Sequence, residues 1–216
     1  MNGTVGQTIF YTFRAVERIG KEIDNLLNLI ENEIASSFPK SQNRNHPKIV
    51  TKWDTVHRDS ENQWTYTDAA GYIGIGKTQD KPKGYVSFQI SLDSDGMKSD
   101  VCHNQEPLLH VILWEDHVDF DGDFYFSLAN IHDDGNPTLQ DGVLFSWEDN
   151  AADWSDQVWA YSLQLTSINS IDDVKNKIIK PIYTLLQNGV DAVSVKDIDG
   201  IIHYEMKEGR YGIRQV

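Results

Sequence analysis

PLLHVILWEDH, residues 107–117, gives the strongest indication of the architecture in this sequence. Successive side chains of a β-strand point to opposite faces. Here the residues on both faces are apolar: one face carries Leu109, Val111 and Leu113, and the other carries Leu108, Ile112 and Trp114. Apolar side chains on both faces are typical of a strand that is covered on both sides. The sequence therefore predicts a central strand here.

Further strands are expected on both sides of this central one. Residues 84–93 alternate strictly, with a dry face of Val86, Phe88, Ile90 and Leu92 and a wet face of Tyr85, Ser87, Gln89 and Ser91. The other expected strands are 63–67, 71–77, 121–130, 142–147 and 157–165, and a last hairpin joins 192–196 to 201–206. In 121–130, Phe124, Phe126 and Leu128 are expected to point inward. Short turns between the strands favour antiparallel pairing.

Two helices are expected beside the strands. Residues 6–36 form the first, because their apolar side chains fall on one helical stripe: Ile9, Phe13, Val16, Ile23, Leu27, Ile30 and Ile34. This stripe predicts packing on the sheet, and its heptad-like spacing predicts, as the alternative, pairing of two copies in a homodimer. The second helix begins after Ser170, a capping residue with Asp173 three positions on, contains Pro181, and ends at Gly189.

These elements together predict the α+β class, a twisted antiparallel β-sheet with a long N-terminal helix and a second helix near the C-terminus packed on it. We interpret residues 1–216 as a single domain, with the helix in 1–36, a linker in 37–48, and the sheet with one helix in 49–216. Residues 1–6 lack the features of a signal peptide. No stretch approaches the ~20 apolar residues of a membrane-spanning helix. A soluble, cytoplasmic protein is therefore expected, and the single cysteine, Cys102, cannot form an intrachain disulfide.

The charge is distributed unevenly along the chain. Residues 99–174, the acidic window, contain no Lys or Arg but 16 Asp and Glu residues, and the other 140 residues are close to neutral. The formal net charge of −14 therefore comes from this window, which also holds four of the six Trp residues. Such a field repels nucleic acid and anionic membranes and attracts basic surfaces. We expect a basic protein partner and no direct contact with nucleic acid or membrane.

The hypothesis that follows is a non-enzymatic binding module. It docks on and inhibits a basic, nucleic-acid-handling protein, and it is similar in charge and size to immunity proteins, antitoxins and DNA-mimic proteins. Acidic side chains steer association, and aromatic side chains supply affinity. The residues expected at the interface are Glu115, Asp116, Asp119, Asp121, Asp123, Trp147, Glu148, Asp149 and Trp154.

The alternative is a metal-dependent hydrolase or nuclease. Mg²⁺ and Ca²⁺ prefer oxygen ligands, and His117, Asp119, Asp121 and Asp123 place several ligands within a few residues. This run departs from the EF-hand pattern, because Gly122 lies between the second and third Asp.

A second candidate for the same chemistry is Asp199 with Glu205 and Lys207, which resembles the Asp…Glu-x-Lys pattern of restriction-type nucleases. No glycine-rich nucleotide loop is present in the sequence. His110, in the middle of the central strand, is interpreted as a core histidine with a hydrogen bond. We therefore favour a function without catalysis and without a cofactor.

Overall fold

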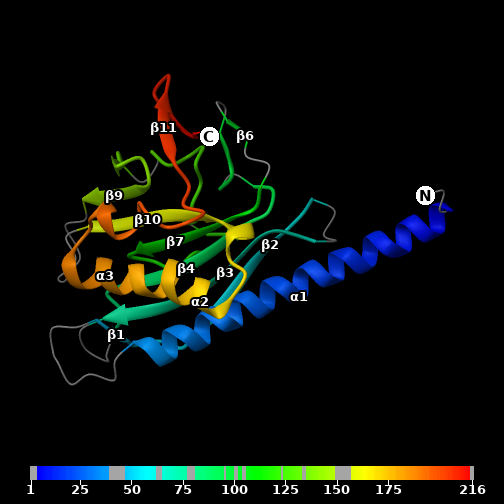
Figure 1. Cartoon of the computed structure of the whole chain (residues 1–216), viewed down its shortest axis with the longest axis horizontal. Helices are drawn as coiled ribbons and strands as arrows, with labels where there is room; N and C mark the ends of the chain where they lie inside the picture. The colour runs from blue at the N-terminus through cyan, green and yellow to red at the C-terminus, as the bar shows by residue number, and fades with distance from the viewer. Residues whose placement is uncertain are drawn as a thin grey trace.

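The computed structural model describes residues 4–38, 47–61, 65–76, 81–94, 96–99, 102–103, 106–122, 124–132, 135–148 and 157–214. Its main sheet has eight strands in the order β1-β3-β4-β7-β10-β9-β8, and β2 also pairs with β3 (Figure 1). These strands are β1 (Lys48–Ile49), β2 (Asp54–Asp59), β3 (Tyr66–Gly76), β4 (Gly84–Ser91), β7 (Leu108–Trp114), β8 (Thr138–Gln140), β9 (Leu144–Glu148) and β10 (Gln157–Gln164). Two small hairpins pair β5 (Lys98–Ser99) with β6 (Cys102–His103), and β11 (Tyr204–Lys207) with β12 (Arg210–Ile213).

The central position of β7 is confirmed. It pairs antiparallel with β4 on one side and with β10 on the other. Leu109, Val111 and Leu113 enter the core on one face of the sheet, and Leu108 and Ile112 enter the core on the other face. The apolar side chains on both faces of residues 107–117 therefore correctly predicted that this strand is covered on both sides.

A helical layer covers the first face of the sheet (Figure 1). It consists of α1 (Val5–Ser37) and a segment that runs through α2 (Ile171–Asp173), the π-helical η2 (Val174–Ile179) and α3 (Lys180–Asn188). Its buried residues are Ile23, Leu27, Ile30 and Ile34 from α1, and Val174, Ile178, Ile182 and Leu185 from the second segment. The α+β class, the antiparallel sheet and the two helices on it are as the sequence predicted.

The first half of α1 extends away from the body of the protein (Figure 1). The helix begins with a capping box, in which the Thr4 side chain accepts from the Gln7 backbone N–H and the Gln7 side chain accepts from the Thr4 N–H. Its buried side chains begin at Ile23, two residues after the middle of the helix. The apolar stripe therefore packs on the sheet only in the second half of α1.

The second helical segment begins and ends where the sequence predicted. The Ser170 side chain accepts from the Asp173 N–H at 3.1 Å, which satisfies a free donor of the first turn. Pro181 is the second residue of α3, next to the π-helical turns of η2, and a proline inside a helix is a common site of such an irregularity. Gly189 ends α3 with φ of +88°. Short 3₁₀ helices, η1 (Leu165–Ser167) and η3 (Ala192–Ser194), flank this segment.

The prediction of a solvated second face is wrong for β4. Ser87, Gln89 and Ser91 are fully buried, because residues 115–122 and 124–131 fold back across this face and form a second core on it. The apolar side chains of that segment are Val118, Phe120, Phe124, Phe126, Leu128 and Ile131. Gln89 and Ser91 do not require solvent, because neighbouring groups satisfy their hydrogen bonds.

Four other elements differ from the sequence predictions. Residues 66–76 form one long strand where two were expected, and β2 was not predicted. Residues 124–127 are not a strand, although Phe124, Phe126 and Leu128 do point inward. The last hairpin lies further along the chain, at 204–213, because Glu208 and Gly209 both adopt positive φ and form its two-residue turn. The expected linker, 37–48, falls mostly outside the described residues.

Candidate protein-binding surface

Residues 115–122, the acidic segment, leave β7 and cross the second face of the sheet. Val118 and Phe120 point into the second core, and Phe120 is 8% exposed. Between and around them the carboxylates point outward: Glu115, Asp116 and Asp121 are exposed, and Asp119 is half-buried. The alternation of apolar and acidic residues therefore presents a row of carboxylates above a packed interior.

A tight turn fixes the end of the acidic segment. The Asp119 backbone N–H donates to the Phe124 carbonyl oxygen at 2.8 Å, and the Asp121 N–H donates to Asp119 Oδ1 at 3.0 Å. A side chain at Gly122 would meet Asp119 Oδ2 at 2.6 Å. A larger residue at position 122 would therefore displace the Asp119 carboxylate, which is part of the turn.

An aromatic cluster lies beside the acidic segment. The His117 ring packs on Tyr72 at 4.4 Å between centroids and on Tyr85 at 5.4 Å, and the two tyrosines contact each other edge to face at 6.1 Å. All three side chains are half-buried. They come from β3, β4 and the acidic segment, so pairing of the strands positions the cluster. Partly exposed aromatic side chains next to carboxylates are suited to contact with basic residues.

The electrostatics of this cluster reflect the neighbouring carboxylates. The Tyr72 hydroxyl donates to Asp54 Oδ2 at 3.4 Å. Partial burial, and then the negative charge of Asp54, raise the pKa of Tyr72 above its usual value, and Asp119 adds to the effect. Asp54 and Asp119 therefore act on one hydroxyl from two separate segments.

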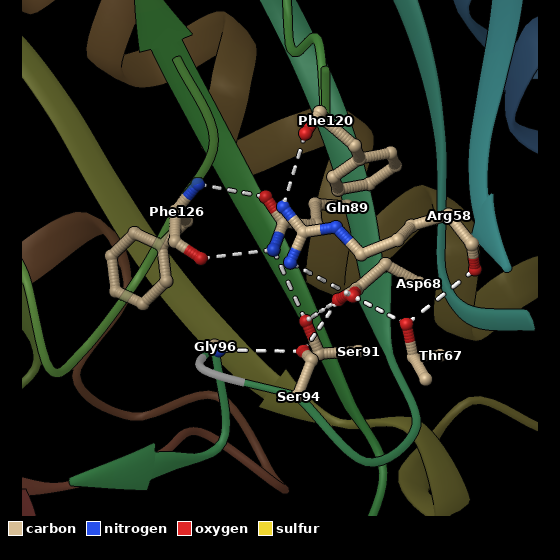
Figure 2. A network of polar contacts seen from close by, with 9 residues as sticks. All are labelled: Arg58, Thr67, Asp68, Gln89, Ser91, Ser94, Gly96, Phe120 and Phe126. Atoms are coloured by element: carbon tan, nitrogen blue, oxygen red, sulfur yellow. Dashed lines mark hydrogen bonds and ion pairs between the residues drawn. The ribbon is translucent and has the colours of Figure 1, made fainter. Parts of the chain in front are cut away.

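Figure 2 shows how the segment after the turn is attached to the sheet. Gln89 of β4 donates from Nε2 to the Phe126 carbonyl oxygen at 2.9 Å and accepts from the Phe126 N–H at Oε1 at 2.8 Å. Both backbone groups of Phe126 are thus satisfied by one side chain, which replaces the ladder of a strand. This explains why residues 124–127 are extended and inward-facing without being paired as a strand.

Arg58 of β2 attaches the acidic segment at a second point (Figure 2). Its guanidinium donates to the Phe120 carbonyl oxygen at 3.3 Å and lies over the rings of Phe120 and Tyr125, at 5.1 and 4.2 Å from their centroids. It also lies 3.8 Å from a carboxylate oxygen of Asp68. A cation from outside the acidic window therefore stabilises the segment from beneath.

Asp68 is the centre of this network and is 1% exposed. Its Oδ1 accepts from the hydroxyls of Ser91 at 2.8 Å and Ser94 at 2.5 Å, and its Oδ2 accepts from Thr67 at 3.2 Å (Figure 2). A buried carboxylate is tolerated only where it is paired and hydrogen-bonded, and Arg58 with three hydroxyls meets that requirement. The network is therefore a structural support for the acidic segment.

A second buried polar network, separate from that of Asp68, lies on the same face of the sheet. His110 Nδ1 lies 2.6 Å from Ser162 Oγ, which accepts from the Tyr204 hydroxyl at 2.6 Å. His110 is fully buried, as the sequence interpretation expected, and burial lowers its pKa to about 3. A serine beside a histidine can act as a nucleophile with a base. Ser162 and His110 are both 0% exposed, however, so a substrate does not reach this pair.

The expected interface residues are not all at the surface. The side chain of Trp147 is 7% exposed and packs edge to face on Trp114 at 5.1 Å. It therefore lies inside the second core and does not project as a surface anchor. Asp123, Asp149 and Trp154 lie outside the described residues, as does the side chain of Glu148. Glu115, Asp116, Asp119 and Asp121 are brought together on one segment.

The residues of the alternative hypothesis enter other contacts. Within the part of the chain that the structure describes, no three His, Cys, Asp or Glu side chains are placed to hold one metal ion. His117 packs on the tyrosines and Asp119 holds the turn. Asp199 accepts from Lys177 Nζ at 3.0 Å.

The nuclease-like pattern is divided in a similar way. Glu205 pairs with Lys207 at 2.5 Å on β11, whereas the contact of Asp199 is with Lys177 on η2. Lys177 also donates to the Ser167 carbonyl oxygen at 2.8 Å. Asp199 therefore belongs to a contact that joins the turn at 197–200 to the helical layer.

Sequence reasoning missed several residues of this surface. Tyr72, Tyr85 and Asp54 come from the sheet, and Arg58 and Gln89 attach the segment from beneath. One signal was available: Tyr85, Ser87, Gln89 and Ser91 form an unbroken polar row beside a strand that was predicted to be covered on both faces.

Comparison of the chain with protein-family models, with curated proteins and with solved structures found no match. Among the described helices, none is both long and apolar enough to cross a membrane.

Proposed function

We propose that the protein is an acidic, non-enzymatic binding module that docks on a basic protein partner and inhibits it. The observation that carries the proposal is the row of carboxylates on the acidic segment beside the Tyr72, Tyr85 and His117 cluster. Carboxylates at this position steer a cationic partner and give the association its salt dependence. The half-buried rings supply the apolar contact that charge alone does not.

The rigidity of the surface supports the same proposal. Gln89 and Arg58 hold the segment on both sides of its turn, so the carboxylates are placed before a partner arrives. A preorganised surface loses less conformational entropy on binding. The basic surfaces best matched by a fixed carboxylate row are those that bind phosphates, so the partner is proposed to be a nucleic-acid-handling protein.

The test compares two charge reversals of equal size. The double variant Asp116→Lys/Asp121→Lys changes the exposed acidic segment, and Asp197→Lys/Glu208→Lys changes exposed carboxylates outside both the window and α1. Binding to a fluorescent arginine-rich peptide is measured for each as a function of salt. The first pair should weaken binding about tenfold or more and reduce its salt dependence, and the control pair should have a much smaller effect.

The natural partner is then sought by capture with the wild-type chain and both variants. A protein retained by the wild type and by the control, lost by Asp116→Lys/Asp121→Lys, and inhibited on addition of the wild-type chain would support the proposal. Equal loss with both pairs would mean that net charge, and not this surface, determines binding, and the proposal would fail.

We also infer that α1 pairs with a second copy of the chain. The free half of the helix exposes large apolar side chains: Val5 at 78%, Ile9 at 62%, Phe10 at 58%, Tyr11 at 68%, Phe13 at 63% and Ile19 at 48%. The stripe that is buried at Ile23 and Leu27 continues along this half. An exposed contiguous apolar patch of this kind indicates an interaction site.

The charge pattern of α1 favours an antiparallel arrangement of the two copies. Residues 5–21 carry Arg14, Arg18 and Lys21 against Glu17, whereas residues 22–37 carry Glu22, Asp24, Glu31 and Glu33 with no basic residue. An antiparallel pair places the positive half of one helix beside the negative half of the other. A parallel pair would place like charges together, which is unfavourable. A groove beside residues 18–29, lined also by Leu165 and Ile171, continues the apolar surface.

Sedimentation equilibrium tests the self-pairing. Ile9→Glu introduces a charge on the apolar stripe and should dissociate the dimer. Gln7→Glu introduces the same charge on the opposite side of the helix and preserves the capping box, so it should leave the dimer intact. A wild-type chain that is monomeric at high micromolar concentration, or an equal effect of both substitutions, would contradict the inference.

A further inference from the structure

A groove of about 800 Å³ lies between the middle of α1 and the segment 165–171, which leads into α2 (Figure 1). The end of the sheet also contributes to it, and most of the lining is apolar: Ile19, Leu26, Leu29, Leu92, Leu165 and Ile171. Ile19 and Ile171 are 48% and 49% exposed, so the groove is open to solvent. Its α1 wall, residues 18–29, covers about three helical turns, or about 17 Å.

The groove exposes one flank of α1 beside the stripe that is buried on the sheet. The flank residues Ile19, Glu22, Leu26 and Leu29 are spaced by three and four positions and therefore form one row. The same spacing continues toward the N-terminus through Ala15, Thr12 and Thr8. These three side chains are small, so a second helix can approach this flank closely.

The free half of α1 has the length and the apolar stripe that such a groove requires. Its exposed apolar side chains continue the face that packs on the sheet in the second half of the helix. A two-fold axis perpendicular to this face turns the same flank of each helix toward the other copy and keeps both stripes facing the sheets. The free half of one copy then lies in the groove of the other, with its stripe toward the end of that sheet.

Charge favours a second copy as the occupant. The free half, residues 5–21, carries three basic residues and one acid, whereas residues 22–37 carry four acids and no basic residue. Glu22 lies in the flank row, and its side chain is 66% exposed. An antiparallel second copy therefore brings a cationic segment to an anionic wall, which supports this pairing over other orientations.

We propose that this groove binds residues 8–19 of α1 from a second copy, and that two copies exchange their free halves reciprocally. The proposal rests on the self-pairing inferred above and adds where the helix binds: between α1 and segment 165–171 of the other copy, and not on its free half alone. Placing 8–19 along 18–29 in antiparallel order puts Ala15 beside Glu22 of the second copy.

A substitution in the groove outside α1 is the first test. Ile171 lies in the first turn of a helix, where an acidic residue is favourable, so Ile171→Glu should fold like the wild type. It should raise the dimer dissociation constant about tenfold or more, because the second copy would cover a carboxylate with apolar side chains. Val193→Glu is the control, because Val193 is 62% exposed and lies outside this groove. Sedimentation equilibrium measures both.

Disulfide cross-linking tests the register in a Cys102→Ser background. Ala15→Cys/Glu22→Cys should link two chains through positions 15 and 22, since cysteines seven residues apart on one helix are about 10.5 Å apart and cannot pair within a chain. Glu17→Cys/Asp24→Cys has the same spacing on the opposite flank and should not link. Thr12→Cys would link only if the free halves paired with each other. Mass spectrometry of tryptic peptides identifies the linked positions.

A dimer that is weakened by Ile171→Glu and linked between positions 15 and 22 would support the proposal. A wild-type dimer that Ile171→Glu and Val193→Glu affect equally, or that links through Thr12→Cys and not between 15 and 22, would overturn the groove site and leave the self-pairing intact. A monomeric wild-type chain would overturn both, and it would leave the proposal for the acidic surface unaffected.

Discussion

Gln89 and Phe126 are joined by a two-point contact: the side-chain amide of Gln89 donates to the Phe126 carbonyl oxygen and accepts from its N–H, at 2.9 and 2.8 Å. The residues are 37 positions apart in the chain. Through this contact the sheet holds a segment that forms no ladder with it. The acidic segment is thereby followed by a fixed element, and the turn at Asp119 has a defined end.

Gln89→Leu should destabilise the fold by about 2–4 kcal/mol, because it leaves two buried backbone groups of Phe126 without partners. The matched control is Ser87→Ala on the same strand and the same face. Ser87 Oγ is buried with no hydrogen-bond partner among the described residues, so its removal should cost less than about 0.5 kcal/mol or stabilise the protein. Urea denaturation measures both. Similar effects of the two substitutions would contradict this role of Gln89.

Arg58→Met should lower stability by about 1–3 kcal/mol, because it removes the cation from two aromatic rings and from Asp68. The loss should appear first in the acidic segment, as faster hydrogen exchange of the Asp119 amide, which donates to Phe124. Arg58→Lys retains the charge without the planar group and should have an intermediate effect. Unchanged exchange at Asp119 in Arg58→Met would show that Arg58 does not hold the segment.

The buried His110 should make stability depend on pH. Its folded pKa is lowered by burial from 6.5 to about 3, so the unfolded chain takes up a proton at a higher pH than the folded one does. Stability from this group is complete above pH 6.5 and is lost as the pH falls toward 3, with a slope of up to about 1.4 kcal/mol per pH unit.

His110→Gln removes the titrating group and should flatten that part of the profile. The measurement is the difference between the free energies of unfolding of the two chains across this pH range. Parallel profiles for the wild type and the variant would mean that the pKa of His110 is the same in the folded and unfolded chains, which would contradict this prediction.

Gly96→Ala should be strongly destabilising, because the added Cβ would meet Ser91 Oγ and lie 2.8 Å from His110 Nε2. Ser91 Oγ donates to Asp68 and His110 Nδ1 contacts Ser162 Oγ, so neither side chain can move without losing a hydrogen bond. Gly20→Ala is the control: nothing lies within 4 Å of its added Cβ, and alanine is the better helix former by about 0.8–1 kcal/mol. Thermal unfolding should therefore shift in opposite directions for the two variants, and a tolerated Gly96→Ala would mean that this face is loosely packed.

The parts of the fold that local periodicity determines could be predicted from the sequence. The two apolar faces of residues 107–117, the stripe of α1 and the capping of the second helix at Ser170 are visible as spacing alone. The last hairpin was misplaced because turn signals occur at both 197–200 and 208–209, and only tertiary packing selects the second.

The candidate surface was predictable only in part. The carboxylates of the acidic segment are adjacent in sequence, so their clustering was evident. Tyr72 and Tyr85 join them through strand pairing, which depends on the order of the strands in the sheet. Trp147 was expected at the surface because it lies among acidic residues, but the alternation of β9 turns it inward with Phe145. The order of residues shows which of them are neighbours along the chain. It does not show on which face of the sheet each side chain lies.

The free half of α1 has a consequence for how the proposed partner is engaged. A helix of 33 residues is about 50 Å long, and in an antiparallel pair the two bodies lie toward opposite ends of the paired helices. The assembly would then be bivalent, with one acidic surface on each body. A target with two basic sites at a matching separation would meet the second surface at a high effective concentration, and avidity of this kind can exceed the affinity of one surface by about 10²–10⁴. Many nucleic-acid-binding proteins are themselves two-fold symmetric dimers, whose two sites lie about 34–36 Å apart.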